Sequence, residues 1–435
     1  MKRIMHFFLL FLFFVFFHNV PAMGLELSLE DAVNLALENN LSLKKTEIDL
    51  ASSGFSERNL WSEIFPTISA SASATYRNQL FSGVQPNNQG ISYNLGFSVN
   101  LGLNAGIPYS MRNIQLAHQA NILRYEDARN LLSIQVTKKY FELIAEKNNL
   151  TLLEEVFNLA QRQFTRSETL FRNGLVGELS FTQSRISLEN ARYNHAAALI
   201  THQNSKTEFL AMLGMQSNND ILLLGEINIL KIDADAEVLI NEYLPLRPDI
   251  IRNSQEIERL TMTHMQTIMQ SRAPSLNLSL DWSSSSFDPF TDILSATARV
   301  SIPIDPWIPG TARQQAIARA SGSLEKAKLD MEITENAAKA QIRSLTALLR
   351  NSYDSIIIAR LSLEAARRGY QLTEQGFLNG IVESLTLVDA RNNMANARQR
   401  LLQTELSYFN MILDLSAALN MDWKILIETY GVPNE

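Results

Sequence analysis

The chain has 435 residues, no cysteine, and a formal net charge of −7 from 38 basic and 45 acidic side chains. Without cysteine we expect no disulfide, no thiolate metal site, no cysteine nucleophile and no lipid anchor on cysteine. The acidic balance argues against nucleic acid as a partner, because phosphate backbones bind basic surfaces.

The first residues predict a signal peptide over 1–24. Lys2 and Arg3 precede an apolar run from Phe7 to Phe17, which small residues follow at Val20-Pro21-Ala22 and Ala22-Met23-Gly24. The run is too short to span a bilayer, and the order of basic, apolar and small residues is secretory. Its removal takes the basic count from 38 to 36, and the net charge to −9. No later stretch has about twenty apolar residues in a row, so we expect a mature chain that is secreted, periplasmic or held in a membrane by strands.

The segment Leu27–Leu60 is predicted to be a helix that ends near Pro66. Ser28, with Asp31 three residues later, resembles a capping box, and the apolar stripe that follows has helical spacing.

Two segments in each half of the chain then alternate apolar and polar side chains with the period of a strand. They are Thr67–Tyr76 and Tyr93–Leu103, and Ser275–Trp282 and Leu294–Ile304. Strands of about ten residues have the length that a tilted strand needs to cross a bilayer. The alternative is a soluble antiparallel sheet with one face in a core. The signal peptide and the polar, glycine-bearing second face favour a membrane barrel.

Very long helices are predicted after each strand pair. Tyr109–Arg172 contains neither proline nor glycine, enough for about 95 Å of helix at ~1.5 Å per residue, and Gly310–Gln375 is similar. Two shorter helices, Leu179–Met212 and Leu385–Leu419, follow them. Helices of this length indicate coiled-coil or bundle packing.

A repeated hairpin tip relates the two halves. Aligning Leu170–Arg192 with Phe377–Arg398 places Gly174 on Gly380, an offset of 206 residues, and Arg185 on Arg391. Each copy predicts an αα-hairpin with a glycine at its tip, so we expect an internally duplicated chain. The tip residues are Gly174, Leu175 and Val176 in the first copy and Gly380, Ile381 and Val382 in the second.

Four strands do not close a barrel. Bacterial barrels begin at about eight strands, and an open edge in lipid leaves backbone groups unpaired at several kcal/mol each. The chain must therefore associate. Two copies would give a minimal barrel and three would give about twelve strands with a lumen, which the small polar side chains of the inner face favour.

These features together resemble the TolC-type outer-membrane efflux proteins over essentially the whole mature chain. The most specific marks are Leu29-x-x-Ala32-x-x-x-Ala36-x-x-x-Asn40, Arg247-Pro248-Asp249-Ile250 and the duplicated tips. The resemblance implies a mainly α fold with membrane β: a homotrimer in which a 12-stranded β-barrel in outer-membrane lipid joins a 12-helix periplasmic α-barrel.

The resemblance also implies a duct of a tripartite efflux or type I secretion system. Its tips would dock on a periplasmic membrane-fusion adaptor coupled to an inner-membrane transporter. Substrates would pass unchanged, without enzyme activity or cofactor, and the cargo stays open among drugs, metal ions, siderophores and secreted protein.

A pore constriction is implied on the helix after the second tip. Asp389 falls on the more interior of two family aspartates, whereas Thr386 occupies the other position. A trimer would then carry three carboxylates at this level, which attract cations and repel anions in a narrow pore. Glu383, nearer the tip, would add to a second ring or face the adaptor. The alternative for Asp389 is an ordinary solvated helix residue.

Other groups of residues give weaker evidence for a metal site or a catalytic site. His195 and His202 lie seven residues apart on a helix but have no carboxylate at ligand spacing between them, and Met262, Met265 and Met269 are expected to pack rather than bind metal. No phosphate loop, HExxH or Gly-x-Ser-x-Gly motif occurs. Besides the duct, two classes stay open: a periplasmic helical adaptor or structural protein with a soluble sheet, and a self-contained porin.

The expected organisation follows the repeat. The segments are 1–24 (signal peptide), 25–66 (N-terminal helix), 67–104 (first outer-membrane β-hairpin), 105–217 (first tunnel hairpin), 218–246 (equatorial linker), 247–273 (second-repeat helix), 274–305 (second β-hairpin), 306–420 (second tunnel hairpin) and 421–435 (C-terminal tail).

Overall fold

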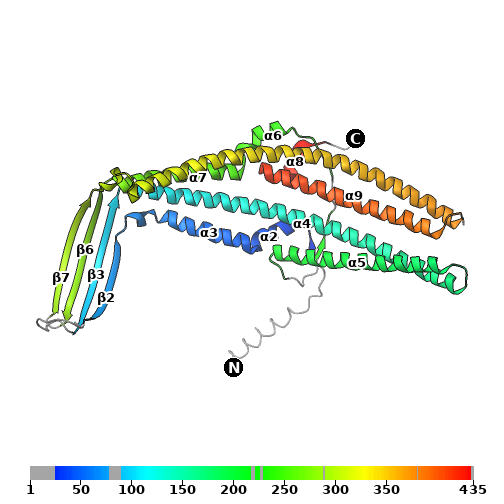
Figure 1. Ribbon diagram of the computed structural model, residues 1–435, viewed down its shortest axis with the longest axis horizontal. Helices are drawn as coiled ribbons and strands as arrows, with labels where there is room; N and C mark the ends of the chain where they lie inside the picture. The colour runs from blue at the N-terminus through cyan, green and yellow to red at the C-terminus, as the bar shows by residue number, and fades with distance from the viewer. Residues whose placement is uncertain are drawn as a thin grey trace, which may run out of the picture. The chain divides into compact units, whose positions relative to one another are not determined.

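A computed structural model describes residues 25–77, 90–216, 221–225, 229–287, 290–379 and 381–432 (Figure 1). Residues 1–24, where the signal peptide is predicted, lie outside this description, as do 78–89, Asp288, Pro289 and Gly380. The chain forms two compact units. Unit 1 comprises Met1–Thr46, Glu126–Arg247 and Ala338–Glu435, and unit 2 comprises Glu47–Tyr125 and Pro248–Ala337.

Unit 2 contains a four-stranded antiparallel sheet in the order β2-β3-β6-β7 (Figure 1). The strands are β2 (Thr67–Arg77), β3 (Gly90–Asn104), β6 (Ser275–Phe287) and β7 (Phe290–Ser301). Phe97 pairs with Ala70 on one side and Trp282 on the other, and Trp282 pairs with Leu294. Since paired residues point to the same face, one face is apolar across all four strands, which confirms the alternation predicted from the sequence.

The apolar face of this sheet is exposed in the single chain. Ile68 is 55% exposed, Phe97 43%, Leu280 43%, Leu294 68% and Val300 66%. The outer edges of β2 and β7 pair with no other described strand. Within the described residues, the sheet therefore has neither a core beneath it nor partners at its edges.

Helices continue from both ends of the strand pairs in unit 2. They are α3 (Leu41–Arg58), the first part of α4 (Ile107–Arg172), α7 (Pro248–Arg272) and the first part of α8 (Ala312–Leu378). Two short 3-10 helices, η1 (Leu60–Ile64) and η3 (Asp305–Trp307), adjoin the edge strands. Polar contacts join α4 to α7, since Arg112 Nη2 donates to Glu258 Oε1 at 2.7 Å. No described helix of either unit combines the length and apolar character that crossing a membrane requires.

The structure divides the predicted helix Leu27–Leu60. A short strand, β1 (Leu25–Leu27), precedes α2 (Leu29–Asn39), and α3 begins after a break at Asn40. Asn40 has an extended backbone, and its Oδ1 accepts hydrogen bonds from the amides of Ser42 at 2.9 Å and Leu43 at 3.1 Å. Such a cap starts a new helix within one residue, so the apolar periodicity shows no interruption. The predicted cap at Ser28 is confirmed, because its Oγ accepts from the Asp31 amide at 3.2 Å.

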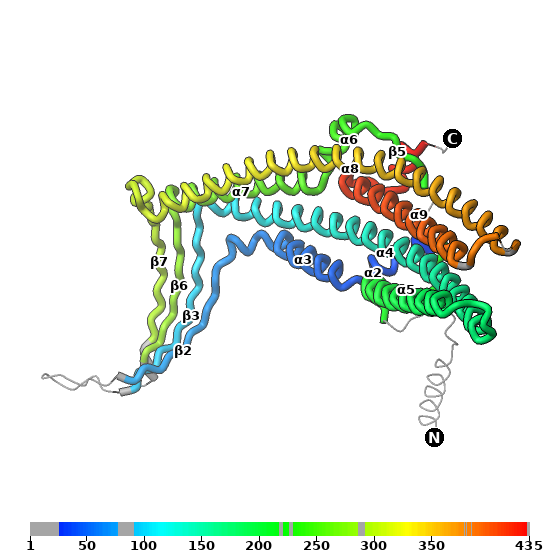
Figure 2. The backbone as a smooth tube through the Cα atoms, turned by 45° about the vertical axis from the view of Figure 1, so that its right-hand side comes forward, coloured from blue at the N-terminus to red at the C-terminus, as the bar shows by residue number. Residues whose placement is uncertain are grey.

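Unit 1 is built on two helical hairpins (Figure 2). In the first, the later part of α4 is followed by α5 (Glu178–Met212), and in the second the later part of α8 is followed by α9 (Ser384–Leu419). The smaller elements are β4 (Ile221–Leu223), β5 (Lys231–Ile232), α6 (Ala236–Tyr243), η2 (Leu244–Leu246), α10 (Trp423–Tyr430) and β8 (Gly431–Val432).

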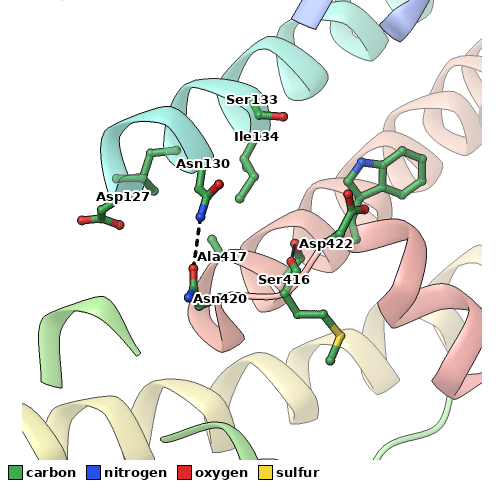
Figure 3. A pocket seen from close by; sticks show the side chains of 11 residues that line it. Asp127, Asn130, Ser133, Ile134, Ser416, Ala417, Asn420 and Asp422 are labelled. Carbon is green, nitrogen blue, oxygen red and sulfur yellow. Dashed lines mark hydrogen bonds between the residues drawn. The ribbon is translucent and has the colours of Figure 1, made fainter. Parts of the chain in front are cut away.

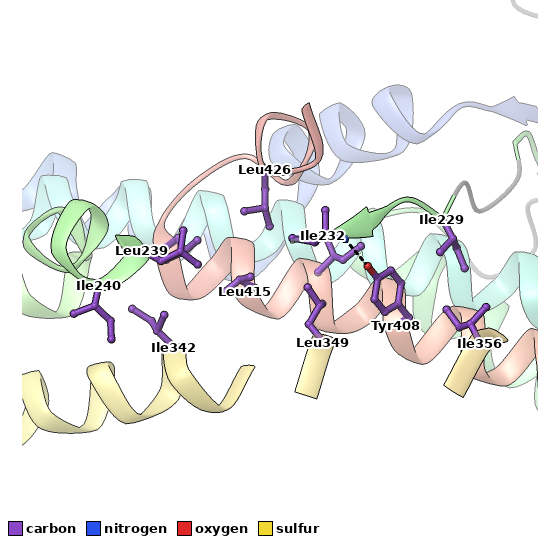
Figure 4. Packing of buried hydrophobic residues seen from close by; sticks show 12 residues of the cluster. Ile229, Ile232, Leu239, Ile240, Ile342, Leu349, Ile356, Tyr408, Leu415 and Leu426 are labelled. Carbon is purple, nitrogen blue, oxygen red and sulfur yellow. Dashed lines mark hydrogen bonds between the residues drawn. The ribbon is translucent and has the colours of Figure 1, made fainter. Parts of the chain in front are cut away.

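One hydrophobic core of unit 1 surrounds Tyr408 on α9 (Figure 4). Buried residues from β5, α6, α8 and α10 contribute, among them Ile232, Leu239, Leu349 and Leu426. The Tyr408 hydroxyl donates to Leu230 O at 2.9 Å and accepts from the Ile232 amide at 3.0 Å. Burial raises the pKa of Tyr408 to about 12, which keeps the phenol neutral. The hydroxyl thus holds the irregular segment before α6 on the helices.

Tyr140 on α4 performs the same task for the parallel pair of β1 and β4. It is fully buried, its hydroxyl accepts from the Leu224 amide at 3.0 Å, and the oxygen lies 2.8 Å from Leu27 O and 2.5 Å from Leu224 O. One phenol therefore contacts both the last residue of β1, Leu27, and the residue that follows β4, Leu224.

Replacing Tyr140 with phenylalanine is expected to lower the free energy of unfolding by ~1–3 kcal/mol, because the hydroxyl's hydrogen bonds to Leu27 and Leu224 are lost. Urea unfolding of the detergent-extracted protein measures this. Tyr193→Phe is the matched control: Tyr193 lies on α5 and is 73% exposed, so its change should stay within ~0.5 kcal/mol. Equal effects of the two substitutions would contradict the anchoring role of Tyr140.

Candidate functional site

The two hairpin tips share a backbone arrangement. The Leu175 amide donates to Leu170 O at 2.8 Å, and the Ile381 amide donates to Gly376 O, also at 2.8 Å. Each donor and each acceptor of the second tip follows its counterpart by 206 residues. Gly174 has a φ of +70°, a conformation in which a side chain costs energy. The predicted equivalent of Gly174, Gly380, lies outside the described residues.

Both tips expose large apolar side chains. Leu175 is 69% exposed and Ile381 80%, while Val176 and Val382 are half-buried. Val382 packs back on its own hairpin, where a Cβ at Gly376 would lie only 2.6 Å from Val382 Cγ2. Leu175 and Ile381 are thus left accessible at the two tips.

Aromatic side chains support the tips from behind. Phe171 and Phe181 stack with ring centroids 4.9 Å apart, which joins α4 to α5. The guanidinium of Arg166 on α4 lies 5.5 Å from the ring centroid of Phe377 on α8, within the range of a cation–π contact. The two hairpins therefore touch just behind their tips.

The predicted constriction residues lie in the first turns of α9. Glu383 is the N-cap of the helix, and Glu383, Thr386 and Asp389 are all exposed. Asp389 lines a groove of about 470 Å³ between α9, α5 and α4, whereas Thr386 and Glu383 do not line it. Of the three candidates, Asp389 is therefore the one that lines this groove.

Arg391 is a residue of this groove that sequence reasoning missed. It is only 4% exposed and lines the groove two residues after Asp389. Its counterpart in the first hairpin, Arg185, is exposed. An arginine on an amphipathic helix is usually solvated, so nothing in the sequence distinguished these two positions.

A second pocket, of about 130 Å³, lies between α4 and the turn from α9 to α10 (Figure 3). Asn130 Nδ2 donates to Asn420 Oδ1 at 3.3 Å across it, and Asn420 caps α9 with a φ of 53°. Nearby, Arg247 of the Arg-Pro-Asp motif is buried and donates to Ala418 O at 2.9 Å. These contacts hold the end of α9 in place, so we assign this pocket a structural role.

The candidate metal residues point to different neighbours. His195 stacks on Phe157 with centroids 5.8 Å apart, while His202 Nδ1 lies 3.6 Å from Glu146 Oε2. No group of three potential metal ligands occurs in the part of the chain that the structure describes. On α7, Met265 is 39% exposed and its neighbours Met262 and Met269 are half-buried.

A family model for outer membrane efflux proteins matches residues 32–215 and 239–421, which together exceed half of the chain. The chain belongs to the outer membrane efflux protein family. The toluene efflux pump outer membrane protein TtgC of Pseudomonas putida is 25% identical, with 94% of this chain and 84% of TtgC covered. The resemblance proposed from the sequence is therefore confirmed.

Solved structures of outer membrane channels share the fold. The Campylobacter jejuni CmeC channel superimposes with a TM-score of 0.74 at 19% identity, covering 92% of this chain and 89% of CmeC. The open state of the Neisseria gonorrhoeae MtrE channel gives a TM-score of 0.71 at 17% identity, covering 90% and 89% of the two chains.

Replacing Gly174 with alanine is expected to loosen the first tip. A Cβ there meets no atom within 4 Å, so the cost is the left-handed backbone alone, ~1 kcal/mol. The Leu175 amide should then exchange with solvent deuterium about fivefold faster. Gly177→Ala is the control, because Gly177 has an ordinary φ of −77° and equal open space. An unchanged rate in Gly174→Ala would refute the strain argument.

Proposed function

We propose that the chain is one protomer of a trimeric outer-membrane duct for efflux. The observation that carries this proposal is the sheet of unit 2, which has an exposed apolar face and two unpaired edges. In hydrocarbon the apolar face is stable, but each unpaired backbone group costs several kcal/mol. Pairing β7 of one copy with β2 of the next removes both edges, and three copies give twelve strands.

Family membership supports the same assembly. The matched relatives and solved structures are outer membrane proteins of efflux systems or outer membrane channels. The repeated tip, with the same hydrogen bond and an offset of 206 residues, supports an internal duplication. Two hairpins per copy would give twelve helices around a tunnel in a trimer. The soluble-sheet alternative needs a cover for the apolar face, and the described residues supply none.

The exposed apolar side chains of the tips support the proposed binding to partner proteins. Leu175 and Ile381 would bind a periplasmic membrane-fusion adaptor, with Val176 and Val382 supporting the turns behind them. An inner-membrane transporter would load the duct through that adaptor. The family implies passage of cargo without chemical change, in efflux or in type I secretion.

Asp389 would supply a ring of three carboxylates near the inner end of the duct. Its exposure on the groove-lining side of α9 leaves the carboxylate accessible to water and ions. In a narrow pore such a ring draws cations and excludes anions. Glu383, at the start of the helix, would face the adaptor or add charge nearer the opening, and Thr386 would add none.

The mass of the detergent-extracted protein tests the assembly. Light scattering, with the detergent contribution subtracted, should give three times the mass of one mature chain. A two-copy mass would indicate the minimal eight-stranded closure. A single-chain mass in detergent and in membranes would overturn the duct.

Ion selectivity tests the ring at Asp389. In planar bilayers, Asp389→Asn should reduce the cation-to-anion permeability ratio, because three fixed charges disappear from the narrow part of the pore. Asp354→Asn, which removes an exposed carboxylate of α8 that does not line the groove, serves as the control and should leave the ratio unchanged. Equal ratios in wild type and Asp389→Asn would place the constriction elsewhere.

A further inference from the structure

The groove between α9, α5 and α4 holds a buried cation without a counter-charge. Arg391 is 4% exposed, and its Nε and Nη1 atoms are buried without a hydrogen-bond partner among the described residues. Leaving a buried donor unsatisfied destabilises the folded chain, and more so when the group is charged. The guanidinium of Arg391 therefore lacks hydrogen-bond partners for two of its buried nitrogen atoms.

The groups that face Arg391 do not neutralise its charge. Burial lowers the pKa of Arg391, the Tyr370 hydroxyl on α8 raises it in part, and Arg162 on α4 lowers it further. The Tyr370 hydroxyl donates its proton to Glu374 Oε1 at 2.9 Å. Arg391 forms no ion pair with a described carboxylate, and the nearby Arg162 makes the surroundings more favourable to an anion.

The groove offers the rest of a binding site. Amide side chains line it from two helices, with Asn190 and Asn194 on α5 and Asn392 and Asn396 on α9. Apolar side chains line it as well, including Leu152 and Leu385. The volume of about 470 Å³ falls in the range of sites for small organic molecules. Carboxamides donate hydrogen bonds to oxyanions, and the apolar side chains accommodate a hydrocarbon body.

We propose that this groove binds a small organic anion, a carboxylate on an apolar body, whose oxygens pair with Arg391. The planar guanidinium offers two parallel donors to a carboxylate, which is the strongest neutralisation available to it. A small molecule is favoured over a side chain of a second copy, because Arg391 is already nine-tenths buried within one chain. Asp389 lines the same groove but is exposed, so water and salt screen its repulsion of the ligand.

The site lies within a single chain and goes beyond the proposed duct. Binding at Arg391 and the number of copies in the assembly are therefore measured separately, and either can fail without the other.

The test compares 2-naphthoate with its neutral analogue 2-naphthamide. Isothermal titration of the detergent-extracted, full-length protein should detect naphthoate binding at least tenfold tighter than naphthamide binding. Arg391→Met should remove that preference and weaken naphthoate binding at least tenfold. Arg185→Met, which removes the exposed counterpart in the first hairpin, should bind as wild type does. No naphthoate binding, or equal binding by wild type and Arg391→Met, overturns the proposal.

Thermal unfolding separates ligand binding from a hidden structural partner. Without ligand, Arg391→Met should unfold at a higher temperature than wild type, because an unpaired buried charge is removed. Naphthoate should raise the midpoint of wild type by more than it raises that of Arg391→Met at the same concentration. A lower midpoint for ligand-free Arg391→Met would show that Arg391 already pairs with a carboxylate in the assembly, and would refute the proposed site.

Discussion

Backbone pairing at the edges of the four-stranded sheet is the constraint on which the rest of the molecule depends. Water satisfies an open edge in solution, but hydrocarbon offers neither donor nor acceptor. The apolar face, with Ile68, Phe97 and Leu294 exposed, is suited to hydrocarbon. The same strands therefore favour a lipid environment and cannot enter it alone. Pairing with other copies of the chain, as proposed above, would resolve that conflict.

The helices of unit 1, like the strands, leave apolar side chains exposed in the single chain. Unit 1 concentrates its buried side chains around Tyr408 and Tyr140, close to the short strands. Towards the tips, large apolar side chains stay exposed on α5 and α8, for example Ile186 at 55% and Leu361 at 61%. Burying one such side chain is worth ~1.5–3 kcal/mol. In the proposed assembly, these exposed apolar residues would pack against neighbouring helices.

Periodic features were predictable from the sequence, and single contacts were not. The strand faces followed from alternation, and the tips followed from Gly174 and its repeat, because both depend on local backbone geometry. The break at Asn40 was missed because one capping side chain replaces a turn of helix without changing the apolar stripe. The burial of Arg391 was missed because it depends on α4 and α8, whose residues are remote in sequence.

Arg185 and Arg391 show how a repeated pattern supports two different roles. They occupy equivalent positions 206 residues apart, yet the first is exposed and the second is buried. Equivalent backbones carry both, so the difference arises from what packs against each helix. The groove between the two hairpins encloses the arginine of the second hairpin, whereas the first hairpin presents the same side chain to solvent. The repeat thus supplies the helical framework twice but a buried arginine only once, at the groove where we propose anion binding.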